Sequence, residues 1–245
     1  MKLLIDAGNT RIKWALVETG VWLQTDTLPI EHADNLAHFF GRHFTNLGLD
    51  SRKIKIYASN VAGEKIEQHI RRITTGHPPD FVVARKNQCG VHNRYTKPSQ
   101  LGSDRWCALI AAWNLMRGGC LVVNCGTATT IDRLSAQGEF LGGVILPGLE
   151  LMQRSLHDAT AQLRSMQGKY APLPLNTADA LFSGAIQASC GAIERQYTLC
   201  ETGSAPVLLS GGAAIQLHAH VNLPTQIVDN LVLQGLLLIA GEAGA

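Results

Sequence analysis

Two short corners of the sequence carry residue types that could bind phosphate. The first corner is DAGNT at residues 6–10 and the second is NCGT at residues 124–127, and each interrupts two stretches of β-forming residues. Glycine and small polar residues let backbone N–H groups and Thr or Asn side chains approach an anion without a Cβ in the way. The carboxylates of Asp6 and Asp132 could hold Mg²⁺ or its waters, and the metal would then bridge to the phosphates of ATP.

One such corner alone is weak evidence, because an ordinary hairpin turn often has the same composition. The second corner strengthens the hypothesis, since both show an apolar strand, a short polar residue, a small residue, glycine, Asn or Thr, and a second β-like stretch. Lys13 or Arg11 could add positive charge, although both would be equally ordinary as solvent-exposed residues. The patterns G-x-x-x-x-G-K-[ST] and G-x-G-x-x-G are absent from the sequence, which argues against P-loop and Rossmann sites.

Two further stretches hold candidate functional residues. Gly211 and Gly212 follow an apolar strand, and such a pair either lies flat against a nucleobase or ribose or forms a tight turn. In LGSDRW, residues 101–106, Asp104 lies at the start of an expected helix. The simpler interpretation is that Asp104 is the N-cap of this helix. Acting as a base, Asp104 would accept the proton of an attacking hydroxyl, and Arg105 could bind a carboxylate or phosphate.

The elements that must position these residues alternate between strands and helices. Residues 2–5 and 12–17, with the stretch VWLQTDTLPI behind them, predict an antiparallel meander. Helical spacing in residues 31–48, a β-rich IKIYASNV, a helical EKIEQHIRRI and a strand in DFVVA follow, and residues 101–119 predict another helix. This alternation favours an α/β fold. The echo between the corners predicts a duplication, with halves 1–118 and 119–245 that share a cleft.

Composition excludes several classes of protein. Of the 245 residues 46% are hydrophobic and 16% charged, which predicts a globular protein, and the net charge of +2 shows no basic stripe for nucleic acid. The apolar stretches at both ends are too short for a signal peptide or a membrane span, so we expect a cytoplasmic protein. The six cysteines form no C-x-x-C pair and are expected to be reduced, and the nine histidines show no metal-site spacing.

Four stretches together resemble the type III pantothenate kinases. They are DAGNT at residues 6–10, YTKPSQLGSDRW at 95–106, NCGTATTID at 124–132 and NTADA at 176–180, and the resemblance covers essentially the whole chain. It implies a duplicated actin- and hexokinase-like (ribonuclease H-like) α/β fold, in which each half has a mixed sheet flanked by helices. It also implies a homodimer that transfers the γ-phosphate of ATP, with Mg²⁺, to pantothenate in the first step of coenzyme A synthesis.

The resemblance also assigns roles to individual residues. Asp104 matches the catalytic base, and Thr177 matches a residue that reaches the pantothenate of the neighbouring subunit, with residues 178–200 as an interface helix. The implied ATP-binding residues are Asp6, Ala7, Gly8, Asn9, Thr10, Arg11, Ile12, Lys13 and Thr127, with Asp6 also near Mg²⁺. The implied pantothenate-binding residues are Tyr95, Gly102, Ser103, Asp104, Arg105 and Thr177.

One position departs from the family pattern. Asn124 stands where the family has an Asp that helps to hold a monovalent cation, K⁺ or NH₄⁺. This departure motivates an alternative, a nucleotide-binding regulatory protein without turnover, although Asp6, Asp104 and Asp132 are all retained. A second alternative is a kinase of this fold that phosphorylates another small hydroxyl compound, against which the block from Tyr95 to Arg105 argues.

Overall fold

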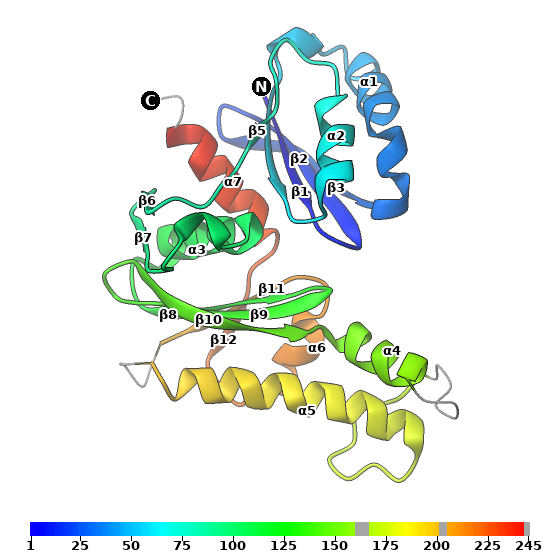
Figure 1. Cartoon of the computed structure of the whole chain (residues 1–245), viewed down its shortest axis with the longest axis vertical. Coiled ribbons are helices and arrows are strands. Elements are labelled where there is room, and N and C mark those ends of the chain that lie inside the picture. The colour runs from blue at the N-terminus through cyan, green and yellow to red at the C-terminus, as the bar shows by residue number, and fades with distance from the viewer. Residues whose placement is uncertain (160–166, 201–204, 243–245) are drawn as a thin grey trace. The chain divides into compact units, whose positions relative to one another are not determined.

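The computed structural model describes residues 1–159, 167–200 and 205–242 (Figure 1). The chain forms two compact units, the first from residues 1–111 together with the segment that begins at Leu231, the second from residues 112–230. The division expected from the sequence, 1–118 and 119–245, differs mainly at the C-terminal end. There α7 (Leu231–Glu242) packs on strands β1 (Lys2–Ala7), β2 (Arg11–Glu18) and β4 (Lys55–Asn60) of the first unit, because its apolar surface covers a face of that sheet.

The first unit is built on a five-stranded sheet of order β3-β2-β1-β4-β5. Strands β1 (Lys2–Ala7), β2 (Arg11–Glu18) and β3 (Val21–Pro29) form the expected antiparallel meander. Strand β4 (Lys55–Asn60) runs parallel to β1, and the short β5 (Asp80–Phe81) runs parallel to β4. The hydrophobic run DFVVA therefore supplies a strand of two residues only.

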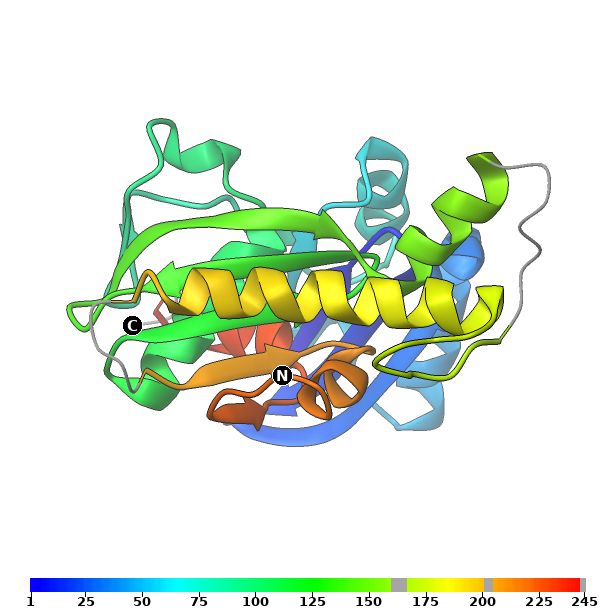
Figure 2. The ribbon, with the colours of Figure 1, turned by 90° about the horizontal axis from the view of Figure 1, so that it is seen from below.

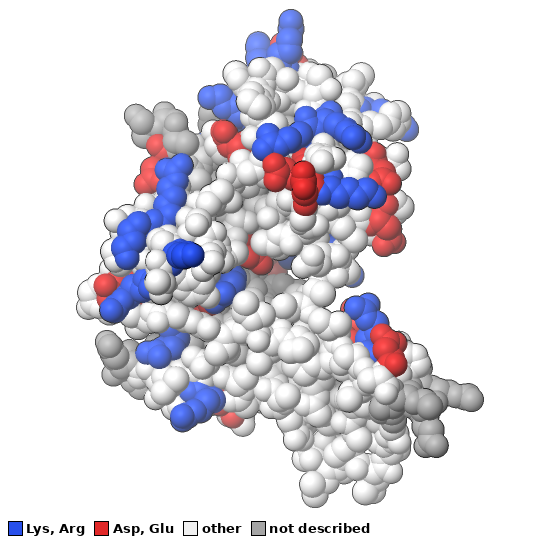
Figure 3. Space-filling model, in the orientation of Figure 1, with Lys and Arg blue, Asp and Glu red and all other residues white. Residues whose placement is uncertain are grey.

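Helices cover one face of this sheet through residues at helical spacing. A 3₁₀ turn (Ile30–Asn35) leads into α1 (Leu36–Asn46), and α2 (Glu64–Arg71) follows β4. They bury Phe40, Phe44 and Ile70 against Trp14 and its neighbours on β1 and β2. The outer surface of α1 and α2 carries both signs of charge (Figure 3), and Arg71 pairs with Glu67 one turn earlier at 2.7 Å.

Short elements join this sheet to the next long helix. After β5, a small antiparallel hairpin of β6 (Asn87–Gln88) and β7 (Val91–Asn93) and a 3₁₀ turn (Pro98–Gln100) lead to α3 (Ser103–Met116). Another 3₁₀ turn (Ser51–Lys53) lies earlier, between α1 and β4. Gln88 accepts a hydrogen bond at 2.9 Å from the indole of Trp106, which ties the hairpin to α3. The expected helix at 101–119 is therefore present with closer bounds.

The second unit repeats the arrangement of a mixed sheet with flanking helices. Its strands have the order β12-β11-β8-β9-β10. The bounds are β8 (Cys120–Cys125), β9 (Ala128–Leu134), β10 (Glu139–Pro147), β11 (Val207–Ser210) and β12 (Thr225–Ile227). The helices are α4 (Leu149–Ala159), α5 (Thr177–Tyr197) and α6 (Ala214–His218). Figure 2 shows α5 lying over the strands and running along them, and Ile186 and Ile193 join the core of this unit.

The six cysteines are free thiols, as expected from their spacing. Burial is the main cause that raises the pKa of the thiols of Cys120 and Cys125 to about 12. Within residues 1–159, 167–200 and 205–242, no helix has both the length and the apolar character needed to cross a membrane.

Candidate active site

Asp6 lies at the carboxyl end of β1, in a row of polar residues that crosses three strands. In the antiparallel register it faces Lys13 of β2, and in the parallel register it faces Ser59 of β4. Residues paired in this way project to the same face of the sheet. The neighbours Ile5 and Ala7 project to the opposite face and belong to the core under α1 and α2. Strand alternation thus separates the polar row from the core.

The charge of Asp6 is poorly stabilised in the protein alone. Burial and, after it, the nearby carboxylate of Asp104 raise the pKa of Asp6 from 3.8 to about 7, and only Lys13 opposes them. A carboxyl group in such surroundings gains from a bound cation, which would favour its ionised form. The surroundings of Asp6 therefore fit a divalent metal or its bound water.

The first corner forms a tight hairpin turn between β1 and β2. The N–H of Gly8 donates to the carbonyl of Arg11 at 3.0 Å, and the side chains of Asn9 and Thr10 are exposed. A Cβ added at Gly8 would meet the Arg11 carbonyl oxygen at 3.4 Å, which is ordinary van der Waals contact, and the φ angle of Gly8 lies outside the left-handed region. The fold itself therefore does not require glycine at this position.

Asp104 is the second residue of α3 rather than its N-cap. The helix begins at Ser103, and the carbonyl of Gly102 accepts the first helical hydrogen bond, from the N–H of Trp106 at 3.0 Å. The Oδ1 of Asp104 accepts from the N–H of Arg105 at 2.8 Å. Burial raises the pKa of Asp104, and the hydrogen bonds from backbone N–H groups and the charge of Arg105 oppose this rise.

The guanidinium of Arg105 is held beside Tyr95. Arg105 is 5% exposed, and its Nη1 donates to the hydroxyl oxygen of Tyr95 at 3.0 Å. Asn93 is fully buried and accepts a hydrogen bond from the Tyr95 N–H at 3.0 Å, which fixes the segment that presents the tyrosine. The first unit thus brings together five of the six residues expected for the acceptor site: Tyr95, Gly102, Ser103, Asp104 and Arg105.

The second corner is the β8–β9 turn of the other unit, and the start of α4 supports it. The N–H of Gly126 donates to the carbonyl of Ala128, and the N–H of Gly148 donates to the carbonyl of Thr127 at 2.8 Å. A Cβ at Gly148 would lie 2.0 Å from the carbonyl oxygen of Gly126, so only glycine allows this approach. The sequence does not mark Gly148, because the residues that it approaches lie in the β8–β9 turn, whereas Gly148 itself follows β10.

Asn124 lies in a second polar row, formed with Ser210 of β11 and Thr130 of β9. The Nδ2 of Asn124 and the Oγ1 of Thr130 are buried, and neither has a hydrogen-bond partner among the described residues. Asp132, two residues beyond Thr130 on the same face, is fully buried. A carboxylate at position 124 would need a cation to balance its charge, whereas the neutral amide does not.

The turn after β11 requires glycine at one of its two glycine positions but not at the other. Gly211 has a φ of +100°, and a Cβ there would lie 2.5 Å from the carbonyl oxygen of Cys125, so the turn itself requires glycine. Gly212 has no atom within 4 Å of such a Cβ and no positive φ. Of the pair, only Gly212 is left without a structural explanation, and it remains a candidate for contact with a nucleoside.

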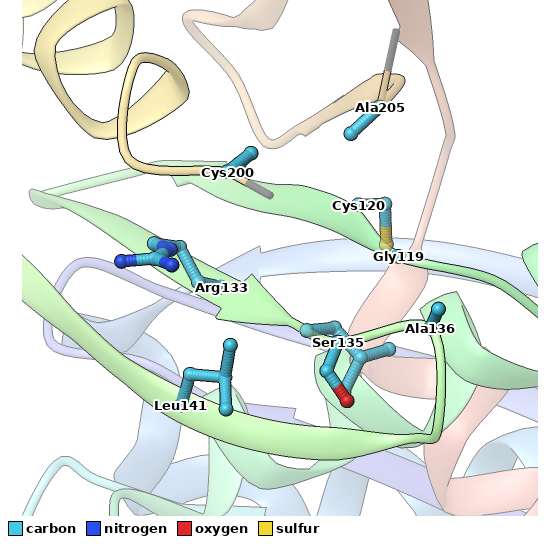
Figure 4. A pocket seen from close by; sticks show the side chains of 9 residues that line it. Gly119, Cys120, Arg133, Ser135, Ala136, Leu141, Cys200 and Ala205 are labelled. Carbon is cyan, nitrogen blue, oxygen red and sulfur yellow. The ribbon is translucent and has the colours of Figure 1, made fainter. Parts of the chain in front are cut away.

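Thr177 is the first residue of α5, on the exposed surface of the second unit. The side chain of Asn176 caps the helix by accepting from the N–H of Asp179 at 2.9 Å. The expected interface segment, residues 178–200, coincides with α5 apart from its last residues. A small pocket lies elsewhere in this unit, lined by Cys120, Arg133 and Cys200 among others, and contains none of the expected site residues (Figure 4).

Comparison with known proteins identifies the family. The model of the type III pantothenate kinase family matches residues 2–199. The type III pantothenate kinase of Aromatoleum aromaticum is 46% identical over 100% of both chains. That of Nitrosospira multiformis is 45% identical over 98% of this chain and 91% of its own.

A solved structure supports the fold. A Baf family protein from Campylobacter jejuni aligns with a TM-score of 0.61 at 23% identity, over 99% of this chain and 98% of its own. Solved structures similar to this chain, together with its two mixed sheets and their flanking helices, confirm the expected duplicated actin- and hexokinase-like α/β fold. This chain belongs to the type III pantothenate kinase family.

Proposed function

We propose that this protein transfers the γ-phosphoryl group of ATP to the primary hydroxyl of pantothenate, the first step of coenzyme A synthesis. The observation that supports the residue roles is the approach of two carboxylates in the first unit, Asp6 at the end of β1 and Asp104 in the first turn of α3, which interact electrostatically. Asp6 is suited to binding a metal ion, and Asp104 is suited to accepting a proton. A magnesium ion would neutralise the charge of the phosphates.

Asp104 accepts the hydroxyl proton of pantothenate as the oxygen attacks phosphorus. Its raised pKa makes it a better proton acceptor than an ordinary aspartate. Arg105, oriented by Tyr95, binds the acceptor's carboxylate or stabilises charge on the phosphates. Because the transition state of phosphoryl transfer is loose, positioning and charge neutralisation contribute most of the acceleration.

ATP is bound by residues of the two corners. Residues 6–13 supply backbone N–H groups and the charge of Lys13, and Thr127 supplies a hydroxyl from the second corner. The assignment of the first corner is supported by Gly8, a glycine that the turn itself does not require and that lets a phosphate approach the backbone. Gly212 contacts the nucleoside. The protein acts as a homodimer in the cytoplasm, with Thr177 of one subunit contacting pantothenate in the other.

The monovalent cation site of the family is weak in this protein. Asn124 offers a carbonyl oxygen but no negative charge, and its buried Nδ2 lacks a partner among the described residues. The polar row of Ser210, Asn124 and Thr130 could ligate K⁺ or NH₄⁺ only through neutral oxygens.

The test is a coupled assay of ADP release with Mg²⁺ and ATP, run with pantothenate and with a panel of other small hydroxyl compounds. We expect turnover that depends on pantothenate, and a roughly 10²-fold or greater fall in kcat for Asp104→Asn with the fold retained. Turnover only with another acceptor would identify a different kinase. ADP release with none of them would leave a nucleotide-binding protein, and a near-normal Asp104→Asn would show that Asp104 is not the base.

A further inference from the structure

Ser59 connects the two carboxylates of the proposed site, although nothing in the sequence marked it. Its place on β4 puts it beside Asp6 in the parallel register. Its hydroxyl oxygen lies 2.9 Å from that of Ser103, the first residue of α3, which immediately precedes Asp104. One buried hydrogen bond therefore ties the strand next to Asp6 to the helical turn that carries Asp104.

This bond is protected from water. Ser59 is fully buried and Ser103 is 8% exposed. Removing either hydroxyl would leave the other buried without this partner, and such a loss costs more than the loss of an exposed hydrogen bond. The first turn of α3 is held to the sheet more firmly by such a bond than by packing alone, because hydrogen-bond geometry restricts both distance and angle.

The carboxylate of Asp104 is held within its own turn by a hydrogen bond. Its Oδ1 accepts the N–H of Arg105 at 2.8 Å and occupies space that a side chain at position 102 would need. The carboxylate therefore moves with the turn, and the turn is held by Ser103. Any shift of α3 from β4 would change the distance between the base and the residues at the end of β1.

We propose that Ser59 is a positioning residue for phosphoryl transfer, which acts through Ser103 to hold Asp104 at a fixed distance from Asp6. It contacts no substrate itself. The inference rests on the proposed function, since it assumes that Asp104 is the base and that Asp6 lies beside the phosphates. The rate would then depend on a residue of β4, a strand that contains none of the residues assigned to the site.

The test is a double-mutant cycle with Ser59→Ala, Ser103→Ala and the double variant, assayed for kcat, for KM of ATP and for calorimetric binding of pantothenate. We expect Ser59→Ala to lower kcat roughly tenfold, because small misplacements of a reacting group are costly, with KM of ATP within twofold. In the Ser103→Ala background the same change should lower kcat less than twofold further, because the partner is already gone. Unchanged kcat for Ser59→Ala, or fully additive losses, would overturn the inference.

Two additional comparisons keep the result interpretable. Ser59→Thr and Ser59→Val add nearly the same volume but differ in the hydroxyl, so the Thr variant should retain several-fold more kcat if the hydrogen bond matters; equal rates would contradict the proposal. Ser135→Ala removes another buried hydroxyl, one that accepts two backbone N–H groups in the β9–β10 turn, and should leave kcat unchanged. If the natural protein lacks pantothenate-dependent turnover, the proposed function fails. If the natural protein is active and the Ser59 variants have the same kcat, the proposed function stands and this inference alone fails.

Discussion

At the scale of single residues, each unit holds a polar group whose surroundings are unfavourable in the protein alone. Asp6 is an acid whose ionised form is disfavoured by burial and by a second carboxylate. Asn124 has a buried amide nitrogen without a partner among the described residues. Isolated groups of this kind reduce the stability of the folded protein, and they are typical of positions where a ligand completes the set of contacts.

For Asp6 the cost can be measured in the protein without ligands. Because the pKa rises from 3.8 to about 7 on folding, the folded state retains a proton that the unfolded state has lost, so this carboxyl group lowers stability progressively as pH rises from about 4 to about 7. We expect Asp6→Asn to be more stable than the natural protein at pH 8, by on the order of 2 kcal/mol or roughly 4–8 °C in Tm.

Thermal unfolding of both proteins at several pH values measures this difference. It should shrink as the pH is lowered toward 4, while turnover is lost at every pH. A Tm difference that is the same at pH 5 and pH 8 would show that the charge of Asp6 is not the cause.

Asn124 predicts an unusual response to monovalent cations. At constant ionic strength we expect weak or no activation of the natural protein by K⁺ or NH₄⁺ relative to Na⁺, because a neutral amide attracts a cation less than a carboxylate does in a place screened poorly by water. Asn124→Asp should introduce or strengthen saturable activation. Strong K⁺ activation that Asn124→Asp leaves unchanged would instead mean that other ligands hold the cation.

At the scale of elements, the second corner depends on the junction of β10 and α4. The N–H of Gly148 holds the carbonyl of Thr127, and a side chain at position 148 would collide with two backbone carbonyls of the corner. We expect Gly148→Ala to raise KM for ATP roughly tenfold with a smaller effect on kcat, because the corner is displaced but the base is not. Gly41→Ala in α1, where an added Cβ meets nothing within 4 Å, is the matched control and should leave both constants unchanged. A normal KM for ATP in Gly148→Ala would argue against ATP binding at this corner.

Elements with strong periodicity could be predicted from the sequence, and contacts between distant elements could not. The hairpin of β1 and β2 was expected from two apolar runs around Gly8, and α3 from its apolar run and the glycines that follow it. Ser59 and Gly148 were not expected, because their partners lie on other elements. Ser103, for instance, is 44 positions from Ser59. A serine at the end of a strand and a glycine after a proline carry no periodic signal, and only the tertiary fold shows what they contact.

At the scale of the whole molecule, the proposed homodimer makes each site depend on two chains. Thr177 stands on the exposed N-terminal end of α5, where it could reach a neighbouring subunit. We expect mixtures of Asp104→Asn with an inactive Thr177→Ala, combined under subunit exchange, to recover up to a quarter of the natural activity, because half of the chains form heterodimers and each heterodimer has one intact site. Native mass spectrometry would report whether heterodimers form. Heterodimers without recovered activity would place Thr177 in the site of its own subunit.

The return of α7 to the first unit also bears on how the chain folds during synthesis. The ribosome releases residues 112–230 before the helix that covers β1, β2 and β4 exists, so the second unit can be complete while the first still exposes a face of its sheet. Gly235 approaches Cys107 so closely that a Cβ would lie 1.9 Å from its carbonyl oxygen, so the late helix must dock onto α3 in one register. A chain that terminates just before Leu231 would therefore keep every residue assigned here to the site and still leave the ribosome with an unfinished, aggregation-prone first unit.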